Sequence, residues 1–552
     1  MIKINGKSVT KGIAIGKLAF ISAQKSEISR QTISDKHSEI FRYQEAKARL
    51  TDELHRLFEK AKFEAGEKSA QIFEIHSMML DDKDFNDLIE NKIKDESINA
   101  EYAVKIAEDE FSDFLLSTND EYMKARCADI HDISRRLIEI LTKKESSRLS
   151  LSENSIICAD ELAPSETVKL DKSKVIAFAT RFGSAQSHTA ILAGSMNIPA
   201  LIGLGSSLST EYNGMLAVID GYDGCLYIEP TPEILEKARH RLILDTEHKE
   251  RLKKLKGLDN ISEDGKRIML YANIGTPNDV AEALENDAGG IGLFRSEFLY
   301  LKSDSLPTEE EQFIAYKSVL ERMGNKKVII RTLDIGADKN VEYLNLDKEE
   351  NPAMGFRAIR LCLNNRDIFR TQLRALLRAS AYGKLSIMIP MIISVDEVRQ
   401  VRSILEEIKS ELRGLDIPFD SAVEFGIMIE TPAAVMISDL LAREVDFFSI
   451  GTNDLTQYSL AIDRQNRSLD PFFNPYHLSV KRMIKQTVEN AHKARIWCGI
   501  CGELASDLSM TETLLSLGVD ELSVSAPAIL PLREKIRSVN ISGAKNEILI
   551  NI

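Results

Sequence analysis

Eight short β-rich runs alternate with helix-length segments through the second half of this chain of 552 residues. The runs cover residues 268–273, 290–294, 327–330, 385–390, 425–429, 445–450, 495–499 and 521–524. Strands that alternate with helices are typical of parallel sheets, and eight such units close a (β/α)8 barrel. A doubly wound sheet is the competing architecture, but no G-x-G-x-x-G or Walker loop supports it. The pattern therefore predicts a C-terminal (β/α)8 barrel, also called a TIM barrel.

The first half contains a long stretch that is almost without turn-forming residues. The first proline is Pro164, and Gly66 is the only glycine between Lys17 and Arg181. Apolar residues recur at helical spacing in residues 42–60 and 121–141. A segment rich in Glu, Lys, Ala, Leu and Ile with so few breakers is typical of several long helices. We therefore expect a helical subdomain over residues 25–143.

Strand-like runs lie on both sides of this helical stretch and predict an α/β domain into which it is inserted. They cover residues 12–20, 155–159, 174–178, 215–219 and 225–228. A charged helical segment then precedes the barrel. The expected class is multidomain α/β, with the α/β domain at 1–24 and 144–230, a helical linker at 231–258 and the barrel at 259–552.

Composition limits the kinds of molecule that the protein can bind and the cellular compartment in which we expect it. A net charge of −14 argues against nonspecific binding of nucleic acid or of an anionic membrane surface. The first residues lack the apolar core of a signal peptide, and no apolar run reaches membrane-spanning length, so we expect a cytoplasmic protein without membrane insertion. Six scattered cysteines fit reduced thiols. The single C-x-x-C pair, Cys498 and Cys501, supplies only half of a structural zinc site.

Charged, amide and thiol side chains follow the predicted barrel strands, where barrel enzymes carry out their chemistry. They are Arg295, Arg331, Glu430, Asn453, Asp454 and Cys501, with Arg464 close behind. Arginines bind carboxylate or phosphate in a bidentate fashion, and Glu430 and Asp454 suit Mg²⁺. Cys501 is a candidate proton donor to carbon. Acids that are merely paired with the arginines, and an inert buried thiol, remain the alternatives.

His188 follows a small polar turn and begins an apolar helix, with Ser187 as a suitable N-cap. A phosphoryl group on this imidazole would lie in the favourable field of a helix N-terminus. The alternative is a buried capping histidine. Combined with the barrel, the pattern predicts that the barrel binds a phosphoryl donor and that His188 accepts the phosphoryl group.

Sequence blocks along nearly the whole chain resemble enzyme I of the bacterial sugar phosphotransferase system, one of the phosphoenolpyruvate-utilising enzymes. In order, they are Ser187-His-Thr-Ala-Ile, Asn197-Ile-Pro-Ala-Leu-Ile-Gly, Gly292-Leu-Phe-Arg-Ser-Glu, Arg331-Thr-Leu-Asp-Ile-Gly, Asn351-Pro-Ala-Met-Gly-Phe-Arg357-Ala-Ile-Arg360, Pro390-Met-Ile, Glu430-Thr-Pro-Ala-Ala, Gly451-Thr-Asn-Asp-Leu-Thr-Gln, Asp463-Arg464 and Cys501-Gly-Glu-Leu-Ala. Each block is moderately specific alone, and their order is very specific.

The resemblance implies a role for each candidate residue in phosphoenolpyruvate–protein phosphotransfer. His188 would be the phosphohistidine in a swivelling domain, and Cys501 would protonate the enolate to give pyruvate. Glu430 and Asp454 would hold Mg²⁺. Phosphoenolpyruvate would be bound by Arg295, Arg331, Asn453, Asp454 and Arg464.

The resemblance also implies two protein partners. The family forms a homodimer through its barrel, and its helical subdomain receives a small histidine phosphocarrier protein. The counterpart of the carrier-binding surface in this chain includes residues 74–82.

Around the histidine the chain departs from the family pattern. The family usually reads Gly-Gly-Arg-Thr-Ser-His with a second arginine six positions after the histidine. Here Ala185 and Gly194 replace the two arginines. Gln465 replaces a usual glycine, and His131 stands where an arginine is common. Arg181 is the candidate substitute cation.

Two other functions are alternatives to phosphoenolpyruvate–protein phosphotransfer. A phosphoenolpyruvate synthase or pyruvate phosphate dikinase shares the histidine domain and the barrel, but no residue block is left to build its ATP-binding domain. A regulatory paralogue that senses phosphoenolpyruvate with weak turnover is the other alternative, and the missing arginines motivate it.

Restoring the missing charges in the double variant Ala185→Arg/Gly194→Arg should speed the phosphorylation of His188 by phosphoenolpyruvate. The physical reason is that a guanidinium beside phosphohistidine neutralises its charge. The rate of phosphoenzyme formation measures the effect. An unchanged rate in the double variant would count against this explanation of the departures.

Overall fold

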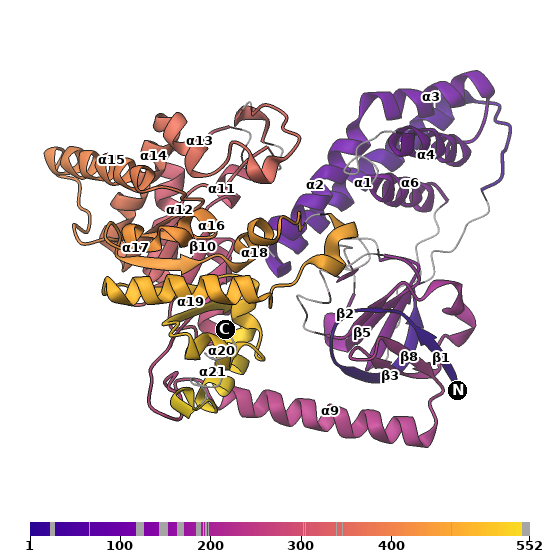
Figure 1. Ribbon diagram of the computed structural model, residues 1–552. Helices are drawn as coiled ribbons and strands as arrows, with labels where there is room; N and C mark the ends of the chain where they lie inside the picture. Colours follow the sequence, from indigo (N-terminus) through magenta and orange to yellow (C-terminus); the bar gives the residue numbers. More distant parts are fainter. Residues whose placement is uncertain are drawn as a thin grey trace. The chain divides into compact units, whose positions relative to one another are not determined.

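The computed structural model divides into two compact units, residues 1–248 and 249–552, which are considered separately. Figure 1 shows the course of the chain through both units. The structure describes residues 1–21, 28–65, 67–117, 126–142, 153–162, 170–183, 189–190, 193, 196, 198–301, 303, 305–337, 339, 341–344, 346–464 and 466–543.

The first unit contains an eight-stranded mixed sheet with the strand order β1-β8-β7-β3-β4-β5-β6-β2. The strands are β1 (Ile2–Asn5), β2 (Lys7–Thr10), β3 (Ile13–Phe20), β4 (Ser155–Ala159), β5 (Val175–Thr180), β6 (Ala200–Ile202), β7 (Leu216–Asp220) and β8 (Cys225–Ile228). The neighbours from β3 to β6 are parallel, and the remaining pairs are antiparallel. Every residue of the central strand β4 is buried, which explains why its sequence after Ser155 is continuously apolar instead of alternating.

Among the described residues between β3 and β4, five long helices are present: α1 (Lys36–Ala65), α2 (Glu67–Asp81), α3 (Lys83–Glu96), α4 (Ala100–Ser117) and α6 (Cys127–Thr142). They share an apolar core in which Leu50, Phe85 and Ile133 are fully buried. Asp82 caps α3 by accepting a hydrogen bond from the Phe85 amide at 2.9 Å. The helices follow from the scarcity of glycine and proline together with the helical spacing of the apolar residues.

The helix α9 (Pro232–Lys253) follows the sheet, and the second unit begins at Lys249, within the last turns of this helix. Within the first unit, the Tyr222 hydroxyl donates to Asp245 of α9 at 3.1 Å. None of the described helices is long and apolar enough to span a lipid bilayer.

The second unit is a closed barrel of eight parallel strands, which confirms the predicted multidomain α/β class with a C-terminal barrel. The strands are β9 (Met269–Ile274), β10 (Ile291–Arg295), β11 (Val328–Arg331), β12 (Leu385–Ile389), β13 (Glu424–Ile429), β14 (Phe447–Ile450), β15 (Trp497–Ile500) and β16 (Glu521–Ser525). All eight predicted runs became strands, and their ends agree to within two residues.

Helices follow the barrel strands and cover the barrel. They are α10 (Val280–Glu285), α11 (Phe298–Leu301), α12 (Glu309–Met323), α13 (Ile359–Asn364), α14 (Arg366–Ala379), α15 (Val395–Gly414), α16 (Pro432–Met436), α17 (Ser438–Leu441), α18 (Thr452–Leu460), α19 (Leu478–Lys493), α20 (Thr511–Ser516) and α21 (Ile529–Arg537). Two of these described helices begin with complete capping boxes: Thr308 with Glu311 on α12 and Ser394 with Glu397 on α15.

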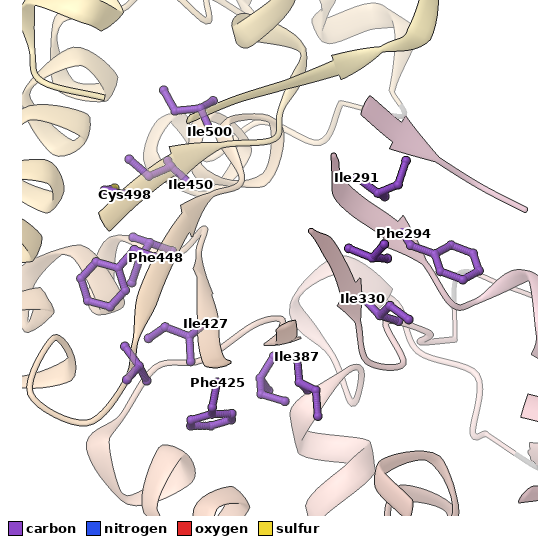
Figure 2. Packing of buried hydrophobic residues seen from close by; sticks show 14 of the residues in the cluster. Ile291, Phe294, Ile330, Ile387, Phe425, Ile427, Phe448, Ile450, Cys498 and Ile500 are labelled. Carbon is purple, nitrogen blue, oxygen red and sulfur yellow. The ribbon is translucent and has the colours of Figure 1, made fainter. Parts of the chain in front are cut away.

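Strand alternation divides the barrel's apolar residues into two groups. The larger group packs with the helices and includes Ile330, Ile427 and Phe448 (Figure 2). The smaller group fills the interior and consists of Leu293, Ile329, Met388, Met428, Phe447 and Cys501, with Trp497 packed against it. This division follows from the two-residue period of a strand.

Substituting Gly426 with alanine should destabilise the barrel. A Cβ atom at Gly426 would lie 2.4 Å from the Phe447 ring, which is itself stacked on Trp497 with centroids 4.5 Å apart. Relieving this overlap requires the stacked pair to move, at a cost of about 1–3 kcal/mol in the free energy of unfolding. Urea denaturation followed by the fluorescence of Trp497, the only tryptophan, measures the change.

Gly414→Ala is the matched control, because a Cβ atom at Gly414 meets nothing within 4 Å. This variant should be neutral or slightly more stable. Equal stability of the two variants would contradict the packing argument.

Candidate active site

The carboxyl ends of the barrel strands bring the predicted residues to one mouth of the barrel. Arg295 and Arg331 end the neighbouring strands β10 and β11 and are partners in the strand register. Glu430 directly follows β13, and Cys501 directly follows β15. Asp454 lies in the first turn of α18, which begins two residues after β14. Parallel strands all end at the same edge of a barrel, so these five residues share that edge.

Arg331 lies at the centre of a buried network of alternating charges. Its guanidinium contacts Glu297 Oε1 and Asp334 Oδ2, each at 2.9 Å. Asp334 Oδ1 also accepts from Arg357 at 2.7 Å. Burial raises the pKa of Asp334, but the charges of Arg331 and Arg357 outweigh it and lower the pKa overall. The network contains two cations and two anions and is therefore charge-balanced.

Both buried arginines keep donor capacity for a ligand. The Nε atoms of Arg331 and Arg357 are buried and have no hydrogen-bond partner among the described residues. Arg295, by contrast, is exposed at the end of its strand. Three guanidinium groups at one mouth suit a small ligand with phosphate and carboxylate groups.

Glu430 is 1% exposed, and its two oxygens have different surroundings. Oε1 accepts a hydrogen bond from the Met391 amide at 2.6 Å, whereas Oε2 has no partner within the described part of the chain. Met391 has a left-handed backbone with φ of 59°, an uncommon conformation for a residue other than glycine. Burial, together with Asp454 and Asp334, raises the pKa of Glu430 to about 8.

The pair Glu430 and Asp454 fits a cation that also takes oxygens from its substrate. Asp454 Oδ1 lies 3.3 Å from the Arg464 guanidinium, at the edge of the mouth. Over the described residues, no group of three or more His, Cys, Asp or Glu side chains is arranged to hold a metal. Two carboxylates without a full protein cage, one of them with an unpartnered buried oxygen, match the way proteins bind Mg²⁺.

Cys501 is buried and remains a thiol at neutral pH. Burial raises its pKa to about 12, although the Ser449 hydroxyl and Arg331 partly offset this. Its backbone carbonyl accepts a hydrogen bond from the Asn273 side chain at 3.2 Å. A protonated thiol held at the mouth can donate a proton but is a poor nucleophile at neutral pH.

Asn453 and Arg464 form the outer part of the mouth. The Asn453 amide donates to Glu503 Oε1 at 3.2 Å and accepts from the Glu503 backbone amide at 3.0 Å. The Arg464 backbone amide donates to Gln457 at 3.1 Å. Asn453 is therefore fixed by its neighbour, while Arg464 is exposed. Gln465 lies outside the described residues.

His188, Ala185 and Gly194 also lie outside the described residues, so the structure does not place the candidate phosphohistidine. Thr189 and Ala190, directly after it, are helical and buried. The nearby Arg181 donates to the Leu208 carbonyl at 2.6 Å and to Asp160 at 2.7 Å. Its charge is thus already paired with a carboxylate.

The expected carrier-binding segment, residues 74–82, contains side chains of opposite exposure. Met78 is 70% exposed, whereas His76 is fully buried. The His76 ring contacts Asp129 at 3.1 Å, and Arg126 pairs with the same carboxylate at 2.9 Å. Including His76 in an exposed surface was therefore wrong, because its ring forms part of the helical core.

Several residues of the mouth were not among the sequence candidates: Glu297, Asp334, Arg357, Met391 and Asn273. Glu297, Asp334 and Arg357 stand inside or directly beside the matched sequence blocks, which is the signal that could have found them. No sequence pattern indicates that the Met391 amide turns toward Glu430. Asn273 ends a predicted strand, but its partner Cys501 is distant in sequence.

Comparison with known proteins identifies the family. Models of phosphoenolpyruvate-utilising enzymes match in three parts: the PEP-binding domain over residues 249–541, the N-terminal domain over 5–126 and the mobile domain over 151–224. Phosphoenolpyruvate-protein phosphotransferases are similar over nearly the full length. That of Priestia megaterium is 43% identical over 98% of this chain and 94% of its own length, and that of Bacillus subtilis is 43% identical over 99% and 96%. The chain therefore belongs to the phosphoenolpyruvate–protein phosphotransferase family.

Proposed function

We propose that this protein transfers the phosphoryl group of phosphoenolpyruvate to its own His188 and then to a histidine of a small phosphocarrier protein. Pyruvate is released in the first step. This is the reaction that begins sugar uptake by the phosphotransferase system. The convergence of Arg331, Glu430, Asp454 and Cys501 on one barrel mouth is the observation that carries the proposal.

The arginines bind the anionic substrate. Arg331 and Arg357 are held by Glu297 and Asp334, so their planar groups are oriented before the substrate arrives. Their Nε atoms, which have no hydrogen-bond partner in the described part of the chain, supply donors to the phosphate or carboxylate oxygens. Arg295 and Arg464, both exposed, bind from the outer side together with Asn453, which follows β14.

Glu430 and Asp454 are the residues that would hold Mg²⁺. When bound there, the ion neutralises charge that develops on the transferring phosphoryl group. The Met391 amide fixes one oxygen of Glu430 and leaves the other available. Arg464, beside Asp454, orients the second carboxylate.

Cys501 completes the reaction at carbon. Departure of the phosphoryl group leaves the enolate of pyruvate, whose methylene carbon must gain a proton. The Cys501 S–H bond breaks, the new C–H bond forms, and a thiolate remains. The high pKa of the buried thiol ensures that the proton is present at neutral pH before the reaction.

The remaining parts of the chain have separate roles in this proposal. Residues 1–24 and 144–230 form the domain that carries His188, residues 25–143 bind the carrier protein, and residues 231–258 link them to the barrel. The barrel, residues 259–552, binds phosphoenolpyruvate and forms the homodimer. The matches to the mobile-domain and PEP-binding family models support the separation of residues 144–230 from the barrel.

Incubating the protein with ³²P-labelled phosphoenolpyruvate and Mg²⁺ should give an acid-labile phosphoprotein and an equal amount of pyruvate. The label should be absent from His188→Ala, because the acceptor nitrogen is gone. His240→Ala, altered on the linker helix, is the matched control and should label normally. Absence of label in the unaltered protein would favour a regulatory binder, and a labelled His188→Ala would place the acceptor elsewhere.

Binding of Mg²⁺ to the free protein should weaken as the pH falls below about 8. Below its pKa of about 8 the Glu430 carboxyl holds a proton, and the metal must displace that proton in order to bind. Titration calorimetry in two buffers of different ionisation enthalpy should detect proton release at neutral pH.

Glu430→Gln should abolish this proton release and most of the binding. Glu444→Gln, on the outside of the barrel and paired with Arg399, is the control and should behave as the unaltered protein. Binding that is independent of pH between 6 and 8 would contradict the assignment of Glu430.

A further inference from the structure

Glu521 is a carboxylic acid buried inside the barrel. It is the first residue of β16, its exposure is 0%, and neither of its oxygens has a partner among the described residues. Burying an unpaired carboxylate is very costly, so such a group keeps its proton. None of the steps proposed above uses this acid.

Two glycines make room for the acid in the barrel interior. A Cβ atom at Gly292 on β10 would lie 2.3 Å from Glu521 Oε1, and one at Gly499 on β15 would lie 2.0 Å from Oε2. Any larger residue at either position would collide with the carboxyl group. Because side chains alternate along a strand, Gly499 and Cys501 face the same side of β15. The carboxyl group therefore lies one layer below the thiol.

Polar side chains lie beside the carboxyl group and hold the backbone at Cys501. The Ser523 hydroxyl oxygen lies 2.3 Å from the same Gly292 Cβ point as Glu521 Oε1, so these two oxygens are close neighbours. Ser523 donates to Asn273 Oδ1 at 2.5 Å, and the Asn273 amide donates to the Cys501 carbonyl at 3.2 Å. An ionised Glu521 would raise the pKa of Cys501, so the protonation of the two groups is electrostatically coupled.

The charged and titratable groups that face Glu521 do not stabilise its ionised form enough to remove its proton at neutral pH. Burial raises its pKa well above the usual value, and Lys327 offsets this only in part. The Lys327 ammonium is itself paired with Glu424 at 2.6 Å. The other facing groups, Tyr271, Cys498 and Cys501, are uncharged at neutral pH because burial raises the pKa of each.

The proposed reaction leaves a problem that an acid at this position solves. After Cys501 has given its proton to carbon, a thiolate remains in a buried site whose mouth is filled by the product. A new proton must reach the sulfur before the next turnover. The acid one layer below is placed to deliver it.

We propose that Glu521 returns a proton to the Cys501 thiolate after each protonation of the enolate. The inference rests on the proposed role of Cys501 as proton donor. The O–H bond of Glu521 breaks, the S–H bond re-forms, and the carboxylate then regains a proton from water. Each pyruvate released therefore consumes one proton from solvent. Gly292 and Gly499 are the positions that allow the acid to occupy this place.

Exchange of the Cys501 proton with solvent tests the proposal directly. Protein equilibrated in H₂O is diluted into D₂O, and phosphoenolpyruvate with Mg²⁺ is added after a variable delay. The methyl group of the first-turnover pyruvate is then analysed for CH₃ and CH₂D by mass spectrometry. The unaltered protein should give CH₂D at short delays. In Glu521→Gln the CH₃ product should persist, with exchange slowed roughly 100-fold, as for loss of a positioned acid.

Two further variants separate proton delivery from packing. Glu521→Asp keeps an exchangeable proton and should exchange much faster than the Gln variant. Ser386→Ala removes an interior hydroxyl on β12 that contacts Glu424, and it should exchange as the unaltered protein does. If Glu521→Gln does not fold, Glu521→Met takes its place, and exchange of the Cys501 proton should be slowed to the same extent. Exchange as fast in the Gln variant as in the unaltered protein, or equally slow in the Gln and Asp variants, would overturn the proposal.

Cys501→Ala distinguishes this inference from the proposed function. The variant should form no pyruvate at a useful rate, because the proton donor is gone. Normal pyruvate formation in Cys501→Ala would refute the role of Cys501 itself. An inactive Cys501→Ala together with normal exchange in Glu521→Gln would refute only the role of Glu521.

Discussion

The barrel mouth depends on one constraint. Arg331 and Arg357 are buried away from water, so each of them needs a partner of opposite charge. A buried cation without a partner is strongly destabilising, whereas a balanced group of cations and anions is tolerated. Arg331 and Arg357 are balanced by Glu297 and Asp334, which come from the segments that follow two neighbouring strands. The same carboxylates that make burial possible also fix the planes of the guanidinium groups. A substrate therefore meets donors that need no reorganisation.

The acids of the mouth are divided between two tasks. Arg331 and Arg357 lower the pKa of Asp334 and keep it ionised, whereas Glu430 is close to Asp454 and Asp334 and holds its proton more tightly. Its environment distinguishes it from the others, because its fixed oxygen accepts from a backbone amide and not from a cation. A carboxyl of this kind ionises when a cation arrives. The cation that binds at the mouth thus completes the charge balance there.

The strands and the strand-end residues were predictable because the period and direction of a parallel strand determine both. Arg295, Arg331, Glu430 and Cys501 come together for this reason alone. The partners of Arg331 were not predictable, since charged residues near a strand end do not reveal which of them pair. The left-handed backbone of Met391 has no sequence signature, since it depends on the surrounding chain. The residues at the strand ends were therefore predictable, whereas the residues that pair with them and the contacts they make were not.

The helices between β3 and β4 have a consequence for the order of folding. These two strands are direct neighbours in the sheet, yet a long segment separates them in sequence. Closing so long a loop is entropically unfavourable while the loop is unstructured. Helices form from local contacts in far less time than distant strands take to pair. A helical bundle that assembles first brings the two strand sequences closer together, so the sheet of the first unit is completed late.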